Sequence, residues 1–217
     1  MCDAPRELKA ILYRRSDRPR LHLEVSRFRK QLFADQLGWI LKTENGLEQD
    51  QFDTDLTEYC ALLENGQLKG CFRAIRCDRP YLVRDAFPGI APEDAFPADV
   101  KAWEVSRFGV HPDRSGLAIS LYAAMFEFAE RRGARALPAL VDLRHERWLH
   151  RLGIQTRRYG EPRPVGHDVR GRVLFGVAGE IPIHEQRRRL GMLFAVPRTL
   201  LEVTDETSFD GLDRVSA

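Results

Sequence analysis

Six charged residues in the first half of the chain are of types that suit acid–base chemistry and the binding of a charged ligand. They lie within apolar helix and strand patterns, where a buried charge without a partner is costly. We therefore expect these side chains to converge on one enzymatic site, with two aromatic residues among them, and to hold a charged substrate. The charged residues are Arg29, Asp50, Asp53, Arg73, Glu104 and Arg107, and the aromatic residues are Phe33 and Trp39.

A helix and a hairpin are the first elements that must position these residues. Apolar residues at helical intervals predict an amphipathic helix over residues 21–41 that ends near Gly38. Two strand-like runs, 56–63 and 68–75, flank the dipeptide Asn65-Gly66, which is typical of a two-residue hairpin turn.

The remainder of the chain alternates between predicted strands and helices. This order predicts one mixed sheet with helices on its faces, an α/β (α+β) fold in a single domain. The predicted segments are a proline-rich surface excursion at 78–97, strands at 102–110, 136–143 and 172–177, and helices at 115–132, 144–152 and 183–194, the first of these helices capped by Ser115 and stopped by Gly133.

The length and charge of the chain set limits on its class. With 217 residues, 43% of them hydrophobic, the chain can build one sizeable core. We expect an N-terminal extension over residues 1–20, a domain over 21–197 and a C-terminal tail over 198–217. The 34 basic and 32 acidic residues nearly cancel, to a net charge of +2, so the composition requires neither a nucleic acid nor an anionic membrane as partner.

The cysteines and the apolar segments bear on metal binding and compartment. Cys2, Cys60, Cys71 and Cys77 form no CxxC pair and have no histidine at zinc-finger spacing, so we expect no structural metal. The hairpin would place Cys60 opposite Cys71, either as a disulfide or as two reduced thiols; without an export signal we favour the thiols. No stretch approaches the ~20 apolar residues of a membrane span, and we expect a cytoplasmic protein.

The charged and aromatic residues follow the order of a known family pattern. Arg29, Phe33 and Trp39 fall on or beside the first helix, Asp50 and Asp53 in the following loop, Arg73 on the second hairpin strand, and Glu104-x-x-Arg107 on a later strand. As an ordered set over roughly residues 21–177, they closely resemble the acyl-homoserine-lactone synthases, the LuxI-type autoinducer synthases of bacterial quorum sensing.

The resemblance implies a fold, a reaction and two substrates. The fold is similar to that of the N-acetyltransferases, a mixed sheet flanked by helices whose central strands splay to admit a thioester. The acyl group of an acyl carrier protein or acyl-CoA thioester passes to the amine of S-adenosylmethionine. The carboxylate then closes a lactone and expels methylthioadenosine. The resemblance implies no metal and no bound prosthetic group.

The residue types suit that chemistry. S-adenosylmethionine carries a sulfonium, an ammonium and a carboxylate, so a pocket of both signs can match it. We take Glu104 as the base that deprotonates the amine, directly or through water, with Asp50 as the alternative. Arg29, Asp53 and Arg73 could instead form ion pairs that pin the helix and loop over the sheet. Phe33 and Trp39 could line the substrate or belong to the core.

Residues that would select the acyl chain lie in the second half of the chain. Leu121, Met125, Leu140 and Leu143 could line an acyl pocket or be plain core. By alignment to the family pattern, Asp142 falls where members that prefer 3-oxo chains tend to have Thr. An acid at this substrate-binding position argues against a 3-oxo preference.

Two other functions compete with this prediction. One is an acyl-CoA-dependent N-acyltransferase of the same fold that acylates another amine without lactonisation. The number of carboxylates argues against it, because transfer to a neutral amine does not need so many acids. The other is a non-catalytic effector-binding module in which the charges only stabilise the fold.

Overall fold

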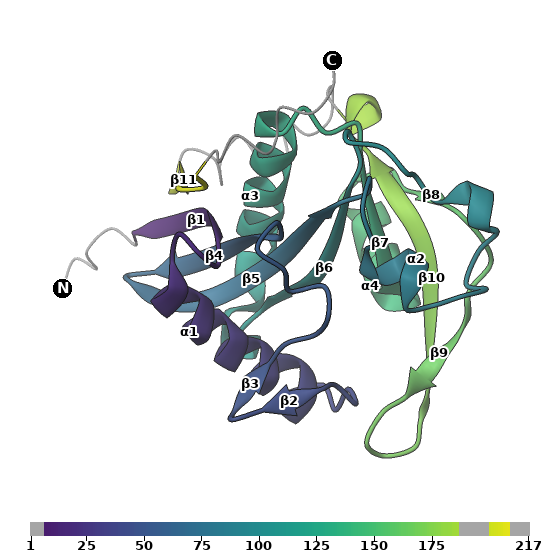
Figure 1. Cartoon of the computed structure of the whole chain (residues 1–217), viewed down its shortest axis with the longest axis horizontal. Helices are drawn as coiled ribbons and strands as arrows, with labels where there is room; N and C mark the ends of the chain where they lie inside the picture. Colours follow the sequence, from purple (N-terminus) through teal and green to yellow (C-terminus); the bar gives the residue numbers. More distant parts are fainter. Residues whose placement is uncertain (1–6, 187–199, 209–217) are drawn as a thin grey trace.

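Two sheets that diverge from each other form the frame of the molecule. The computed structural model describes residues 7–186 and 200–208 (Figure 1). The larger sheet has five strands in the order β11-β1-β4-β5-β6, and β7, β10 and β8 follow one another in the second, where β9 also pairs with β10. The mixed sheet with flanking helices that the sequence predicts is confirmed.

The strands are mostly short. Those of the larger sheet are β1 (Leu8–Arg14), β4 (Glu58–Glu64), β5 (Gln67–Arg76), β6 (Trp103–Val110) and β11 (Leu201–Asp205). Those of the second sheet are β7 (Ala136–Asp142), β8 (Arg157–Arg158), β9 (Arg163–His167) and β10 (Val173–Pro182), and a small hairpin joins β2 (Thr43–Glu44) to β3 (Leu47–Glu48).

The two sheets meet between β6 and β7. Within the described residues, one parallel bridge pairs Ala102 with Ala136, and the amide of Arg135 donates to the Lys101 carbonyl at 2.7 Å. Beyond this point no ladder joins β6 to β7, although both strands continue for several residues. The facing edges of β6 and β7 therefore splay, as the family resemblance of the sequence implied.

Helices cover both faces of the larger sheet. On one face lie α1 (Pro19–Arg29) and its π-helical continuation η1 (Lys30–Gln36), and on the other lies α3 (Ala118–Arg131). The second sheet carries α4 (Leu143–Arg151). The remaining helices are α2 (Leu82–Asp85) and the 3-10 segments η2 (Glu93–Ala95) and η3 (Pro112–Leu117).

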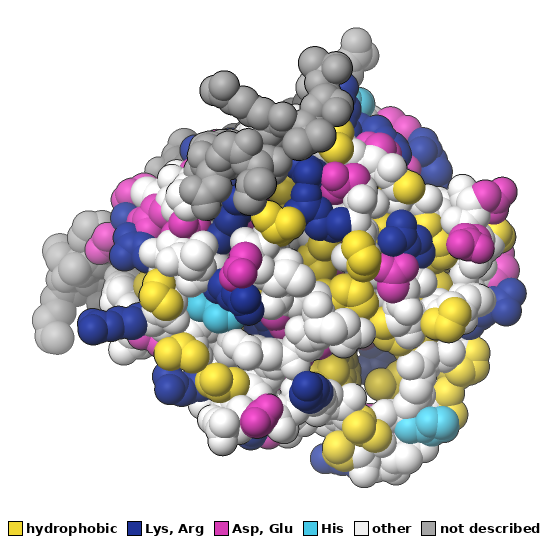
Figure 2. Space-filling model, viewed as in Figure 1, with side chains coloured by type: hydrophobic (Ala, Val, Ile, Leu, Met, Phe, Trp, Pro, Cys, Tyr) yellow, Lys and Arg dark blue, Asp and Glu magenta, His cyan; other side chains and the backbone are white. Residues whose placement is uncertain are grey.

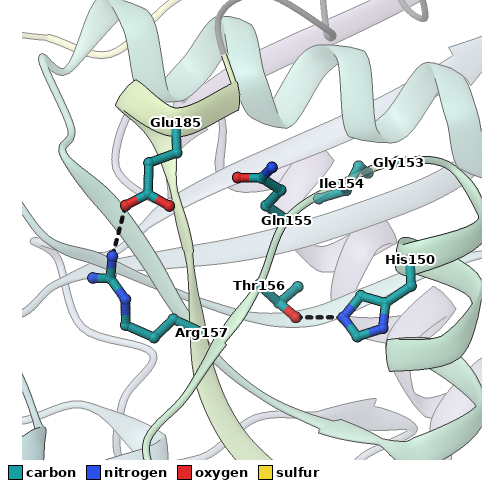
Figure 3. Close-up of a pocket in the computed structure, with 7 residues that line it drawn as sticks. All are labelled: His150, Gly153, Ile154, Gln155, Thr156, Arg157 and Glu185. Carbon is teal, nitrogen blue, oxygen red and sulfur yellow. Dashed lines mark hydrogen bonds and ion pairs between the residues drawn. The ribbon is translucent and has the colours of Figure 1, made fainter.

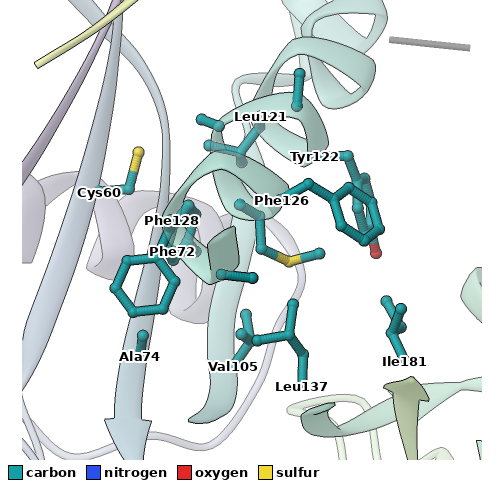
Figure 4. Packing of buried hydrophobic residues seen from close by; sticks show 14 of the residues in the cluster. Cys60, Phe72, Ala74, Val105, Leu121, Tyr122, Phe126, Phe128, Leu137 and Ile181 are labelled. Carbon is teal, nitrogen blue, oxygen red and sulfur yellow. The ribbon is translucent and has the colours of Figure 1, made fainter. Parts of the chain in front are cut away.

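Successive side chains of a strand point to opposite faces of the larger sheet, so the apolar residues form two cores, one on each face. Phe72 and Val105 pack with Leu121 and Phe128 of α3, the arrangement drawn in Figure 4. Tyr59 and its neighbours on the opposite face pack under α1. The larger sheet is thus buried on both faces, which fixes its register.

Three expectations about the chain ends and the cysteines are wrong. Residues 8–14, expected in an N-terminal extension, form β1, and residues 201–205, expected in a tail, form β11 beside it. A central strand buried on both faces does not show the alternating pattern of a half-buried strand. Cys60 lies opposite Phe72 and not Cys71, because a bulge between Leu62 and Leu63 shifts the register, and both thiols are free.

The other elements largely follow the sequence prediction. The first helix, the hairpin, the strand that carries Glu104 and the helix closed by Gly153 are confirmed. Ser115 is not a helix cap, because η3 precedes α3. The proline-rich segment is more than a surface excursion, because Tyr81 and Ile90 are buried in a third apolar cluster. The helix predicted over 183–194 lies mostly outside the described residues.

The surface of the molecule carries mixed charge. Figure 2 shows basic and acidic side chains interspersed over one face. Among the described residues, no helix is both long and apolar enough to cross a membrane.

Arg132 fastens β11 to the fold, and its loss should weaken the domain. Its guanidinium donates to Glu58 at 2.8 Å and to Asp205 at 2.7 Å, and the side chain is buried. Arg132→Ala should lower the free energy of unfolding in urea by about 2 kcal/mol, because the half-buried Asp205 loses its ion pair and the buried Glu58 loses one of its two arginine partners. Arg131→Ala removes a more exposed ion pair with Glu127 and a long, exposed hydrogen bond to the Val203 carbonyl of β11, and it should cost less than ~1 kcal/mol. Equal effects of the two substitutions would contradict this role.

Candidate active site

Arg29 belongs to a buried ion-pair network. Its side chain is 1% exposed and comes from the last turn of α1. Nε donates to Glu48 at 2.6 Å, while Nη1 and Nη2 donate to the two oxygens of Asp53 at 2.7 and 2.9 Å. The Tyr59 hydroxyl also donates to Asp53, at 2.9 Å. Each nitrogen of this guanidinium therefore donates to a carboxylate, either Glu48 at the end of β3 or Asp53 in the loop that follows.

Two further arginines extend the network across the sheet. Arg107 of β6 donates to Glu48 at 2.8 Å and to Asp50 at 2.9 Å. Arg73 of β5 donates to Asp50 at 2.6 Å and lies 3.2 Å from Asp53. The network thus contains three guanidinium groups and three carboxylates, and its charges balance.

The pKa values of the buried acids follow from these contacts. Burial alone would raise the pKa of Asp53, but the hydrogen bonds and charge of Arg29 hold it well below its ordinary value. In Glu48, burial is likewise outweighed by Arg107 and Arg29, and the pKa is lowered. Both residues are therefore ionised at neutral pH, locked as partners of the arginines and poorly suited to accept a proton.

A bulge in β6 brings Arg107 to the same face as Glu104. In a regular strand, residues three apart point to opposite faces. Here Arg73 pairs with Ser106 while Cys71 pairs with Gly109, so β6 has one residue more than β5. Arg107 occupies a left-handed conformation, with φ of 51°, at this bulge. Its side chain consequently points with Glu104 toward α1.

Glu104 differs from the other acids because it is incompletely paired. The side chain is fully buried, and Ser106 donates to one carboxylate oxygen at 3.3 Å. The other oxygen, Oε1, has no hydrogen-bond partner among the described residues, and neither has Nη2 of Arg73. Burial raises the pKa of Glu104 to about 7, against the opposing charges of Arg73 and Arg107. A carboxyl group with this pKa suits a general base at neutral pH.

The two aromatic residues lie at the edge of the network. Phe33 is 2% exposed and stacks on the half-buried Trp39, with ring centroids 5.1 Å apart. Gly109 passes directly beneath Phe33, where a Cβ would come within 3.2 Å of the ring. Phe33 thus belongs to the core, while Trp39 retains a surface that a ligand could reach.

A polar pocket adjoins the network on its solvent side. Its volume is about 310 Å³, and Asp50 and Asp53 form part of its wall. Residues of both signs line the rest, among them Arg15, Lys42 and Glu44. A second depression of about 400 Å³ lies at the end of α4, between Arg157 and His150, and contains none of the predicted site residues (Figure 3).

The structure brings eight of the nine predicted site residues together and leaves Asp142 apart. Asp142 is exposed and caps α4, accepting from the amides of Arg144 and His145 at 2.8 and 2.7 Å. Of the apolar candidates, Leu121 and Met125 are buried in the main core and Leu140 and Leu143 are half-buried.

Sequence reasoning missed Glu48 as a site residue. Its side chain is buried and bridges Arg29 and Arg107. The spacing could have identified it. Glu48 lies two residues before Asp50, so the two side chains point to the same side of an extended chain. Among the described residues, no group of three or more His, Cys, Asp or Glu could hold a metal ion.

The fold defines a class of protein. A mixed sheet that splays between β6 and β7 and is flanked by helices is a fold of the N-acetyltransferase type. A putative N-acetyltransferase from Lactobacillus plantarum shares this fold, with a TM-score of 0.51 and 17% identity over 80% of this chain and 98% of that one.

The particular family follows from closer relatives. The family model described as autoinducer synthase matches residues 14–180, and the chain belongs to this family. The acyl-homoserine-lactone synthase of Pseudomonas aeruginosa is 30% identical over 76% of this chain and 80% of its own length. A probable acyl-homoserine-lactone synthase of Sinorhizobium fredii is 32% identical over 71% and 76%.

Two solved structures also resemble this chain. TofI, in a ternary complex with an inhibitor and MTA, is 34% identical over 81% of this chain and 90% of that one, with a TM-score of 0.68. BjaI, a CoA-dependent acyl-homoserine lactone synthase solved with MTA, shares the fold with a TM-score of 0.77 at 24% identity, over 92% and 93%. The expected family, fold and enzyme class are confirmed.

The cap geometry of Asp142 gives a test of its role. Asp142→Ala should lower the free energy of unfolding by about 1 kcal/mol, because two amides of α4 lose their acceptor. Asp142→Asn keeps an acceptor oxygen and should unfold close to the wild type in a denaturant titration. If the two variants were equally stable, the capping role would be wrong.

The raised pKa of Glu104 predicts a pH-dependent cost to stability. The folded protein holds this proton up to about pH 7, against an ordinary pKa of 4.5, so stability falls as pH rises between these values. Glu104→Gln carries no charge and should be more stable than the wild type by on the order of 3 kcal/mol at about pH 8, and nearly equal at about pH 4. A stability difference independent of pH would contradict the burial of an ionisable Glu104.

Proposed function

We propose that this chain joins an acyl group from a thioester to S-adenosylmethionine and closes the product to an acyl-homoserine lactone, a quorum-sensing signal. The observation that carries the proposal is Glu104, a buried carboxyl group with one oxygen unpaired and a pKa raised to about 7, beside the splayed edge of β6. It stands next to a charge-balanced network in a member of the autoinducer synthase family.

The polar pocket suits S-adenosylmethionine. This substrate carries two positive charges and one negative charge, and the pocket presents Asp50 and Glu44 beside Lys42 and Arg15. Because the arginine network is already neutral, ionised Glu104 leaves one negative charge in excess. The net positive charge of S-adenosylmethionine would offset it and favour the ionised form of Glu104. Binding of S-adenosylmethionine therefore promotes the ionisation of Glu104, the proposed base.

The first step is acyl transfer. Glu104 accepts a proton from the substrate ammonium, directly or through a water molecule bound at Oε1, and the freed nitrogen attacks the thioester carbon. The carbon–sulfur bond breaks, the nitrogen gives up a second proton to the departing sulfur, and the carrier leaves as a thiol. The edge of β6 that faces β7 offers backbone N–H groups outside any ladder, which can stabilise the negative charge on the thioester oxygen.

The second step is lactonisation. The carboxylate of the acylated substrate attacks the side-chain carbon bonded to the sulfonium, and the carbon–sulfur bond breaks to release methylthioadenosine. No proton transfer is needed, because the sulfonium is neutralised as it leaves. Correct positioning of the carboxylate is the main requirement, and fixed charges on both sides of the pocket provide it.

The network residues divide into two roles in this proposal. Arg29 and Asp53 are buried against each other and brace the loop that carries Asp50. Asp50 and Trp39 are partly exposed and contact the substrate, with Arg73 and Arg107 holding Asp50 in place. Both oxygens of Asp50 accept hydrogen bonds from arginines, whereas Oε1 of Glu104 has no partner among the described residues, and we therefore assign the base to Glu104.

We place the reaction in the cytoplasm and propose no metal or prosthetic group for it. The free thiols of Cys60, Cys71 and Cys77 support a reducing compartment. The donor can be an acyl carrier protein or coenzyme A thioester, so the assay includes both.

The proposal is tested by incubating the purified protein with S-adenosylmethionine and a panel of acyl thioesters, followed by mass spectrometry. We expect acyl-homoserine lactone and methylthioadenosine in equal amounts, at a rate that rises with pH up to about 7 as Glu104 ionises. Glu104→Gln should lower the rate by roughly 10²–10⁴-fold. Glu161→Gln, a matched change at an exposed carboxylate, should retain the wild-type rate.

Other outcomes separate the alternatives. An acylated amine without methylthioadenosine would favour an N-acyltransferase that does not form a lactone. Absence of both products with every donor, or full activity of Glu104→Gln, would overturn the proposal.

A further inference from the structure

A turn of the second sheet contacts the chain segment that carries Trp39. The turn joins β9 to β10, and the amide of Val169 within it donates to the Gly38 carbonyl at 2.9 Å. An isolated antiparallel bridge also pairs Asp168 with Trp39. We name this contact, between residues 168–169 and residues 38–39, the clasp. It ties the second sheet to the segment that follows η1.

The clasp lies across the open end of the gap between the sheets. β10 runs antiparallel to β7, and Gly176 lies opposite Asp142, the last residue of β7. The turn that precedes β10 therefore lies beyond the end where β6 and β7 splay, and Figure 1 shows the β9–β10 hairpin extending there. On the other side of the gap, Phe33 covers Gly109 near the end of β6, and Trp39 stacks on Phe33.

Asp168 gives the turn a fixed shape. Its side chain is buried, and Oδ1 accepts from the amides of Arg170 and Arg172, each at 2.9 Å. Oδ2 accepts from Nε of Arg172 at 2.6 Å. The amide of Gly171, which has a φ of 75°, donates to the Asp168 carbonyl at 2.9 Å. An aspartate that binds the amides of its own turn in this way rigidifies the backbone.

The position of Trp39 depends on contacts from both sides of the gap. Its amide donates to the Phe33 carbonyl at 2.9 Å, and its ring stacks on the Phe33 ring. On the other side, the fit to the turn is close, because a Cβ on Gly38 would lie 3.0 Å from Cγ2 of Val169. η1 therefore supports the ring of Trp39, and the second sheet supports its backbone.

We propose that Asp168 is a positioning residue for the binding of S-adenosylmethionine, because its turn holds Trp39 through the clasp and keeps the exposed surface of the indole ring directed at this substrate. The inference rests on the proposed function, in which Trp39 contacts S-adenosylmethionine. An indole face attracts cations, and the substrate carries a sulfonium and an ammonium. The second sheet, which supplies none of the arginines and carboxylates of the charged network, thus contributes to the same site.

The test separates the KM values of the two substrates. Initial rates of methylthioadenosine release are measured with one substrate varied and the other saturating. In Asp168→Ala the KM for S-adenosylmethionine should rise about tenfold, as expected for the loss of one cation–π contact, while the KM for the acyl donor stays within about twofold. Asp168→Asn retains an oxygen that can accept from both amides, and its KM values should stay close to those of the wild type.

A double variant shows whether Asp168 acts through Trp39. In a Trp39→Ala background, Asp168→Ala should raise the KM for S-adenosylmethionine no further, because the group that it positions is absent. Asp99→Ala is a matched control, since Asp99 also accepts from the amide of its own turn, at Lys101, and from Arg135, but at the joined end of the sheets. It should lower stability and leave both KM values unchanged.

The outcomes separate this inference from the function. If the wild type forms lactone but Asp168→Ala keeps its KM for S-adenosylmethionine, or has the same effect with and without Trp39, the positioning role is refuted and the proposed function stands. If Asp168→Ala does not fold, Gly171→Val decides. A β-branched residue at a φ of 75° distorts the turn without a clash, so the same KM should rise. An unchanged KM in that variant would refute the inference, whereas no lactone from any donor would refute the function itself.

Discussion

The pairing of buried arginines with loop carboxylates is the constraint on which the rest of the site depends. A guanidinium as buried as that of Arg29 or Arg73 is tolerated only if carboxylates replace the water it has lost. Glu48 at the end of β3, and Asp50 and Asp53 in the loop that follows, supply that replacement. These ion pairs therefore fix the loop over the sheet, and Glu48 and Asp53 stay ionised.

Glu104 is the exception among these acids. It lies within the field of the same arginines, yet Arg73 and Arg107 donate to Asp50 and Arg73 also donates to Ser106, and no hydrogen bond from either arginine to Glu104 is found among the described residues. Burial then dominates its pKa, which rises while those of Asp53 and Glu48 fall. Acids of similar chemistry thus acquire different roles from their partners, which is a general way to obtain a base at neutral pH.

The larger sheet separates a charged region from an apolar one. Charged groups face α1 and the polar pocket, whereas rings and aliphatic residues face α3 and α4. The bulge at Arg107 serves both sides, because it directs the arginine toward the network and Phe108 toward the rings. One irregularity in one strand therefore aligns an ionic site with an apolar one.

The sequence by itself determined the helix, the hairpin, the mixed sheet and the grouping of the charged residues, because periodicity and residue order express these directly. It did not determine β1 or β11, since strands buried on both faces or added from the distant C-terminal region leave no local alternation. Only the tertiary structure decided that Asp142 caps a helix, that Glu48 joins Arg29 to Arg107, and that Glu104 keeps an unpaired oxygen. Those outcomes depend on which side chains meet across elements, and spacing along a chain does not record that.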